Sequence, residues 1–138
     1  MPDRINHLAV WVAAIAYYLF GWLWYGLLFG NTWMGLINKS PADIQASAGV
    51  LVGSFVLGLI LSYATAIALT RRPEDQTVQQ GVSFAIFMGL AIYGTQTLNN
   101  ALYEKRPIAL WLIDAGYVII GFAIIAAIIG GWKKRASA

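Results

Sequence analysis

The sequence predicts an all-α integral membrane protein, a bundle of four transmembrane helices. Hydrophobic residues make up 59% of the 138-residue chain and charged residues only 11%, whereas soluble domains carry about 25% charged residues. Four apolar stretches each reach the roughly 20 residues that an α-helix needs to cross a bilayer; they cover 5–29, 49–70, 82–102 and 108–132. Few residues remain outside them, so we expect a single transmembrane domain over residues 1–138.

Proline and capping residues extend three of these helices. Ser40-Pro41-Ala42-Asp43 resembles a capping box with Asp in place of the usual Glu, so a helix is expected to start near Pro41 and to stand two turns outside the bilayer. Pro73 and Pro107 start the next two helices in the same way. The expected helices are therefore about 5–29, 41–70, 74–102 and 107–132, and the short segment 31–39 is expected to lie along the membrane interface.

The first apolar stretch is expected to be a retained helix, because a cleavable signal has an apolar core of only about 7–15 residues. Four spans then place both termini on one side of the membrane. That side would carry six basic residues, Arg4, Arg71, Arg72, Lys133, Lys134 and Arg135; the opposite side would carry three, Lys39, Lys105 and Arg106. The positive-inside rule predicts cytoplasmic termini. The adjacent pair Lys105-Arg106 leaves dual topology open as an alternative.

Small residues recur along the helices, where they let helix backbones approach closely. The second helix carries Gly49, Gly53, Gly58 and Ser62, the third carries Gly81, Ala85 and Gly89, and the fourth carries Ala123, Ala127 and Gly131. Such ladders serve packing either within one chain or between copies. Four helices alone bury little surface, so we expect a homo-oligomer.

Asp114 is the one acid within an otherwise apolar span. A carboxylate at such depth costs about 3 kcal/mol on insertion scales, so it needs a partner or a proton. One face of the preceding helix carries polar residues at helical spacing, and the short turn places this face beside Asp114. We expect Gln96 or Asn100 to donate a hydrogen bond to Asp114, with Tyr117 nearby. The predicted polar membrane site comprises Asp114, Gln96, Asn100, Tyr93, Tyr117 and Glu104.

Two interpretations of this site stay open. In the structural one, Asp114 forms a hydrogen-bonded polar pair that fixes the register of the last two helices. In the functional one, Asp114 is an ion- or proton-coupling site that opens to the outer side. Intramembrane ionisable residues are functional candidates by default.

Composition excludes several other classes of protein. The chain has no cysteine, and its single histidine, His7, makes a poor metal site and cannot form bis-histidine haem ligation. No phosphate-binding loop, dinucleotide fingerprint or nucleophile elbow is present. We expect no catalytic residues, no metal, no cofactor and no nucleic-acid partner, and we expect the protein not to be an enzyme.

Several short motifs together resemble a known family. In order, they are Asn6, Trp24-Tyr25, the run 28–33, the run 103–107, the run 110–113, Ala115-Gly116-Tyr117 and Gly130-Gly131-Trp132. The chain resembles a family of small bacterial four-helix membrane proteins, the domain-of-unknown-function family numbered seventeen-sixty-one. Two positions depart from its pattern: Gly26-Leu27 replaces a Ser-Pro pair, and Asp114 replaces an Asn. The resemblance implies the bacterial inner membrane and supplies no activity.

We expect a homo-oligomeric small channel or transporter-like protein, with the lipid bilayer as partner and an unidentified small solute or ion as ligand. The alternative is a membrane assembly or interaction subunit that binds partner helices or lipid. A wet cavity at the polar face of the last two helices would favour transport, and a dry, fully paired face would favour the subunit.

Overall fold

The computed structural model describes residues 4–134 and contains four helical spans that are long and apolar enough to cross a membrane. They are His7–Leu28, Ala48–Thr70, Val78–Glu104 and Ile108–Gly131. This result confirms the predicted four-helix membrane fold. The first span consists of α1 (His7–Trp22) and the π-helical segment η2 (Leu23–Leu28), and the second is α3 (Ala48–Thr70). The third span consists of α4 (Val78–Met88), the π-helical segment η5 (Gly89–Gly94) and α5 (Thr95–Glu104). The fourth span is α6 (Ile108–Gly131).

The connection between the first two spans differs from the expectation. The short helix α2 (Gly30–Leu36) occupies most of the predicted interfacial segment. The capping box of Ser40 and Asp43 forms as expected, but it caps only the 3-10 turn η3 (Pro41–Ile44), because Gln45 is extended. Two hydrogen bonds of this box lower the pKa of the Asp43 carboxyl: the bond from the Ser40 backbone N–H has the larger effect, and the bond from the Ser40 hydroxyl has the smaller one. The predicted helix start at Pro41 is therefore wrong, and α3 begins at Ala48.

The third span also starts later than its proline. Pro73–Asp75 forms the 3-10 turn η4, and α4 begins at Val78, where the Thr77 side chain accepts from the Gln80 backbone N–H at 3.1 Å. Between the turn and the helix, the buried Gln76 donates to the Ile129 carbonyl at 3.1 Å and ties this loop to α6. By contrast, α6 starts directly after Pro107, as expected.

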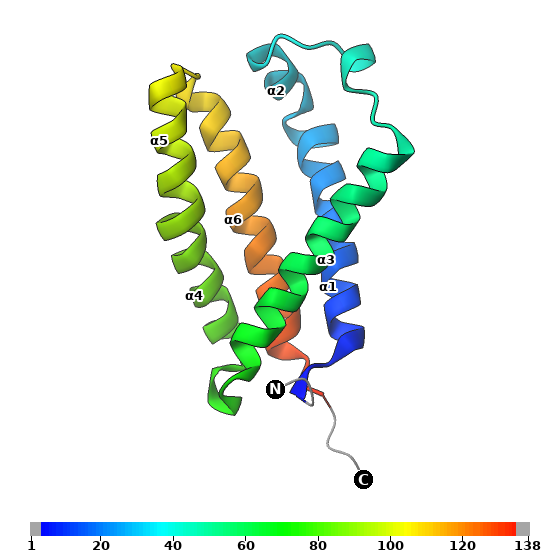
Figure 1. Cartoon of the computed structure of the whole chain (residues 1–138), viewed down its shortest axis with the longest axis vertical. Coiled ribbons are helices and arrows are strands. Elements are labelled where there is room, and N and C mark those ends of the chain that lie inside the picture. Colours follow the sequence, from blue (N-terminus) through cyan, green and yellow to red (C-terminus); the bar gives the residue numbers. More distant parts are fainter. Residues whose placement is uncertain (1–3, 135–138) are drawn as a thin grey trace.

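The bundle is closed at the end that carries both termini (Figure 1). Small residues bring the helices together there: a Cβ on Gly81 would meet the Ala126 carbonyl, and a Cβ on Gly130 would meet the Thr77 carbonyl. The buried face of α6 therefore carries Ala126 and Gly130. The small residues expected to pack there, Ala127 and Gly131, each lie one position further along the helix. Such close backbone approach is how helices associate in lipid.

Polar contacts between segments distant in sequence also close this end. Arg4 donates to the Thr70 carbonyl and Lys133 donates to the Pro73 carbonyl, both at 3.4 Å. The His7 ring nitrogen Nδ1 and the Tyr63 hydroxyl lie 2.8 Å apart. These contacts join α1, α3 and the loops around them.

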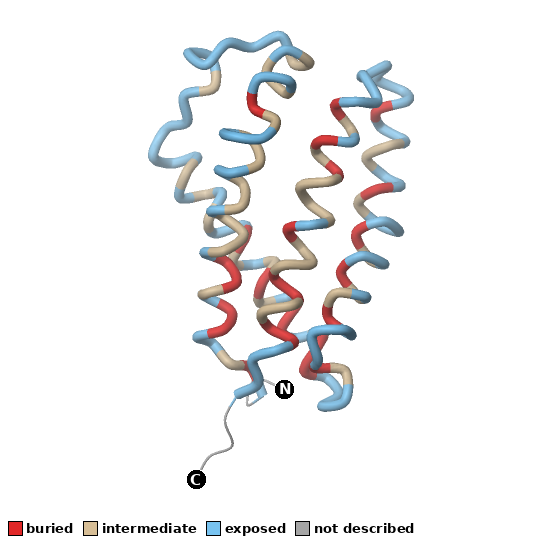
Figure 2. Tube along the Cα trace, turned by 180° about the vertical axis from the view of Figure 1, so that it is seen from behind, coloured by how far each residue is buried: buried red, intermediate tan, exposed pale blue. Residues whose placement is uncertain are grey.

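The opposite end is open. Helix α3 leans away from α4 and α5, so the helices diverge towards α2 (Figure 1), and most of the first half of α3 is exposed (Figure 2). Bulky aromatic side chains take the place of alanines between α1 and α6 towards this end, where Tyr17 and Phe20 stack on Tyr117. Helices separated by rings cannot approach as closely as helices separated by alanine, so the bundle widens.

Candidate membrane site around Asp114

Asp114 accepts a hydrogen bond from the first span. The Tyr25 hydroxyl donates to Asp114 Oδ1 at 2.6 Å, a short bond of the kind expected between a hydroxyl and a carboxylate. Tyr25 lies in η2 and Asp114 lies in the second turn of α6, so the bond joins the first and last spans. Asp114 is only half-buried, and this contact supplies part of the polar environment that an intramembrane carboxylate needs.

The two π-helical segments both carry a tyrosine of this site. Tyr25 lies in η2, and Tyr93 lies in η5 on the third span. A π-turn closes an i→i+5 hydrogen bond, as between the Phe29 N–H and the Trp24 carbonyl at 2.8 Å, and so adds one residue to the turn. The extra residue changes which side chains face the bundle. π-segments are frequent at functional sites, and here two of them meet around one carboxylate.

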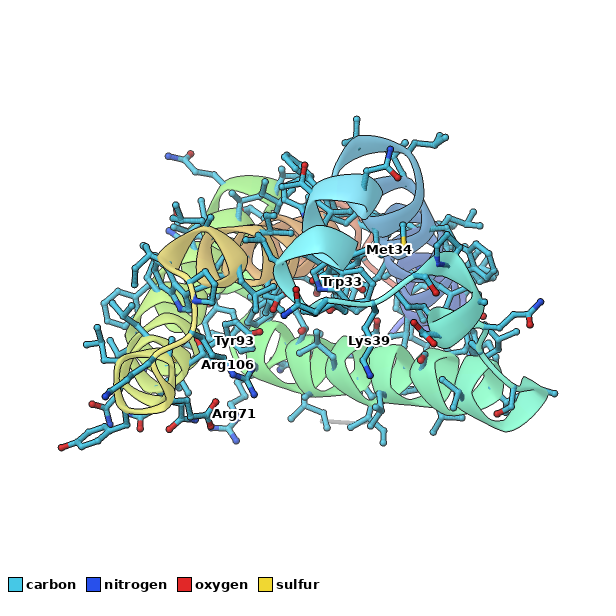
Figure 3. All side chains as sticks on the ribbon, turned by 90° about the horizontal axis from the view of Figure 1, so that it is seen from above. Trp33, Met34, Lys39, Arg71, Tyr93 and Arg106 are labelled. Carbon is cyan, nitrogen blue, oxygen red and sulfur yellow. The ribbon has the colours of Figure 1, made fainter. Side chains whose placement is uncertain are left out.

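A cavity of about 190 Å³ lies beside Asp114, between the third span and α6. Of its nine lining residues, one is Trp111 and six carry other polar or charged groups: Tyr93, Thr97, Asn100, Glu104, Arg106 and Asp114. Figure 3 views the molecule from the open end, where Tyr93 and Arg106 lie next to one another on the α5 side of the bundle. The cavity is thus lined mainly by polar groups and lies towards the open end of the bundle.

Two tryptophans fix the backbone on which the cavity is built. The Trp111 indole donates to Thr97 Oγ1 at 2.9 Å, and the Thr97 hydroxyl donates to the Tyr93 carbonyl at 2.6 Å. The Trp24 indole donates to the Ile113 carbonyl at 3.0 Å, one residue before Asp114. The residues flanking Asp114 are thus held from the third span on one side and from η2 on the other.

Aromatic rings close the site towards the termini. Tyr117 stacks on Tyr17 with ring centroids 5.2 Å apart and meets Tyr25 edge-on at the same distance. Glycines make room for these rings: a Cβ on Gly21 would lie 3.0 Å from the Tyr117 hydroxyl, and a Cβ on Gly121 would overlap the Tyr17 ring. An aromatic layer that includes Tyr17, Tyr25 and Tyr117 therefore lies next to Asp114 on the side of the termini.

The structure brings together most of the residues that the sequence proposed. Tyr93, Asn100 and Glu104 line the same cavity as Asp114. Tyr117 lies below them in the aromatic layer, and Gln96 is exposed and outside the cavity. The donor to Asp114 is Tyr25, so the expected donation from Gln96 or Asn100 is wrong: both of these residues lie on the neighbouring hairpin helix, whereas the donor comes from the first span. The adjacent aromatic residues Trp24 and Tyr25 stand out in the sequence, but no local sequence rule predicts that they contact α6.

The predicted glycine ladder on α3 divides into two halves. Gly58 and Ser62 are buried within the chain, and a Cβ on Gly58 would lie 3.2 Å from the Tyr17 ring. A Cβ on Gly53 would meet nothing within 4 Å, and one on Gly49 would meet only the Ser47 hydroxyl at 3.8 Å. Only the second half of the ladder is thus used for packing within the described chain.

The site presents one carboxylate with free acceptor capacity. Among the described residues Asp114 accepts one hydrogen bond, from Tyr25, although a carboxylate can accept about four. Arg106 shares the cavity, but it pairs with Glu104, and both side chains are more than half exposed. Within residues 4–134 there is no cluster of three or more His, Cys, Asp or Glu side chains that could hold a metal ion.

The fold and this site define a multi-pass helical membrane protein with a polar cavity in the membrane domain. The chain belongs to the family described as protein of unknown function (DUF1761), whose model matches residues 8–130. This match confirms the resemblance drawn from the short motifs. Comparisons with curated proteins and with solved structures gave no significant match.

Substitutions at Tyr25 test the hydrogen bond to Asp114. Tyr25→Phe should lower the free energy of unfolding by about 1–2 kcal/mol, because it removes the donor within the membrane domain. Asp114→Asn should keep the fold, since the amide oxygen still accepts; Asp114→Leu should cost about 1–3 kcal/mol, because the tyrosine hydroxyl loses its acceptor. Equilibrium unfolding in mixed micelles measures these changes.

Tyr18→Phe is the matched control, because Tyr18 lies on the same span and its hydroxyl makes no hydrogen bond to the described residues. An equal loss of stability in Tyr18→Phe and Tyr25→Phe would contradict the assigned role of the bond.

Proposed function

We propose that the protein is a non-enzymatic, homo-oligomeric channel or transporter-like protein of the membrane, in which Asp114 takes up protons or a small monovalent cation. The observation that carries this proposal is the polar cavity beside Asp114, a carboxylate within the fourth span, at the end of the bundle where the helices diverge. The closed end blocks the path to the other side, as a carrier requires in one of its two states. A purely structural carboxylate would not need such a cavity.

The assembly or interaction subunit is the second candidate. It is favoured by the first half of α3, where the apolar side chains of Val50, Val52 and Leu57 are exposed. Lipid or a partner helix covers such a surface in a membrane. The subunit needs no solute site, so the two candidates differ in what they require of Asp114.

The proposed homo-oligomer uses the same half of α3. Gly49 and Gly53 contribute a smooth strip that nothing in the described chain fills. Glycines allow a second helix to approach closely, which compensates for the absence of a hydrophobic driving force between helices in lipid. A second copy of this chain is the occupant we propose.

We further propose the bacterial inner membrane, with both termini in the cytoplasm. The six-to-three distribution of basic residues in the sequence supports this orientation; one of the six, Arg135, lies outside the described residues. It places the Asp114 cavity on the periplasmic side.

Flux through reconstituted protein tests the function. In proteoliposomes with an imposed membrane potential, the protein should carry protons or methylammonium faster than protein-free vesicles do, as followed by an internal pH-sensitive dye. Asp114→Asn should reduce this flux at least tenfold while the unfolding temperature stays level, because the amide keeps the hydrogen bond and loses the charge. The matched control is Asp75→Asn, an identical change at the closed end of the bundle. Flux that persists in Asp114→Asn, or no flux in the unmodified protein, contradicts the proposal.

A pair of glycine substitutions on different helices tests the oligomer. Gly53→Leu should shift the population from oligomer to monomer and leave the unfolding temperature of the monomer nearly unchanged, since a Cβ there meets no atom of the described chain within 4 Å. Gly81→Leu should instead lower the unfolding temperature, because even a Cβ there would overlap the Ala126 carbonyl; overpacking costs about 1–3 kcal/mol. Native mass spectrometry from nanodiscs gives the oligomer. A monomer in the unmodified protein under all lipid conditions would refute the proposed assembly.

Reporter fusions test the orientation. A cytoplasmic reporter fused after Ala138 should be active and a periplasmic alkaline phosphatase should not, because the basic residues hold that end inside. Strong phosphatase activity would reverse the orientation, and equal activity of both reporters would indicate dual topology.

A further inference from the structure

A second and larger hollow adjoins the Asp114 site. Its volume is about 520 Å³, and it lies between the first span, α2 and the first turns of α3. Its lining is mainly aromatic and apolar, and it contains no charged side chain among the described residues; the main contributors are Tyr18, Trp22, Tyr25, Trp33, Met34 and Leu51. Trp33 and Met34 reach it from α2, near the open end of the bundle (Figure 3). We refer to it as the aromatic groove.

Tyr25 separates the aromatic groove from the carboxylate. Its ring lines the groove, and its hydroxyl donates to Asp114 at 2.6 Å. Tyr117 lines the groove as well and packs edge-on against Tyr25. One tyrosine side chain therefore lies between an uncharged aromatic hollow and an intramembrane negative charge.

This combination selects a particular class of ligand. Aromatic faces attract cations through the quadrupole of the ring, more strongly where water is excluded. A carboxylate adds Coulomb attraction for the same charge and repels anions. A volume of several hundred Å³ suits a drug-sized molecule rather than an inorganic ion. Trp33 already stands edge-on to Tyr25 with ring centroids 4.9 Å apart, so aromatic faces are grouped next to the charge.

We propose that the aromatic groove binds a hydrophobic organic cation, with its apolar body between Trp22 and Trp33 and its charge at Tyr25 and Asp114. This inference rests on the proposed function, because it uses the same Asp114 carboxylate, and it adds a hydrophobic organic cation to the protons or small cations proposed there. An acyl chain would fill the groove without interacting with Asp114, and an anion would be repelled by the Asp114 carboxylate. Arg106 does not line the groove and is paired with Glu104.

Two probes of the same shape and opposite charge test the proposal. Protein in nanodiscs of phosphatidylcholine is titrated with tetraphenylphosphonium and with tetraphenylborate by isothermal calorimetry, against empty nanodiscs. The phosphonium should bind saturably and at least tenfold more tightly than the borate. Asp114→Asn should weaken phosphonium binding at least tenfold, and Trp33→Leu, which leaves the carboxylate in place, should weaken it several-fold. Asp75→Asn is the control and should bind as the unmodified protein does.

Equal binding of both probes, or phosphonium binding that Asp114→Asn leaves unchanged, would overturn the inference and indicate a groove for lipid or other apolar molecules. Absence of saturable phosphonium binding would overturn it too. If Asp114-dependent proton flux persists in that case, the substrate class is wrong and the proposed function stands. Charge-selective, Asp114-dependent binding without any flux would support the site and remove the transport function.

Discussion

Close backbone approach at one end of the bundle controls the arrangement of everything else. Gly81 and Gly130 allow α4 and α6 to touch through their backbones, and Val10 and Ala13 of α1 are fully buried against the same core. The hydrophobic effect supplies little attraction between helices in lipid, so this packing and its few polar ties hold the spans together. The other end carries rings instead of methyl groups between α1 and α6. The same four helices therefore form a closed base and an open top.

The open top allows the chain to hold a carboxylate within a span. Asp114 costs several kcal/mol at membrane depth unless it finds donors or water. It finds one donor in Tyr25, and the adjoining cavity gives access to others. The π-helical segments of two different spans, η2 and η5, carry the Tyr25 and Tyr93 side chains next to Asp114. Less regular helix geometry is thus concentrated where the polar site lies, while α6 itself is regular throughout.

The open half of the bundle contains two unlike hollows. One is the polar cavity beside Asp114 and the other is the aromatic groove, which Tyr25 lines while its hydroxyl donates to Asp114. A single side chain that bonds the charge and lines the apolar hollow links the two environments. Glycines at positions 21, 58, 116 and 121 provide the space for these rings, so part of the glycine content serves ring packing rather than helix-to-helix contact.

The sequence by itself determined the class of fold, the four spans and the position of the one intramembrane acid, because length, hydropathy and the rarity of charge are local properties. It also located the capping box at Ser40 and the start of α6 at Pro107. Only the tertiary structure decided that the capping box closes a separate turn, that Tyr25 rather than Gln96 meets Asp114, and that Gly58 packs inside while Gly53 does not. Each of these depends on which helix faces which, and at what angle. Helices that are apolar on all sides leave that choice to the fit of side chains between segments as far apart as Tyr25 and Asp114.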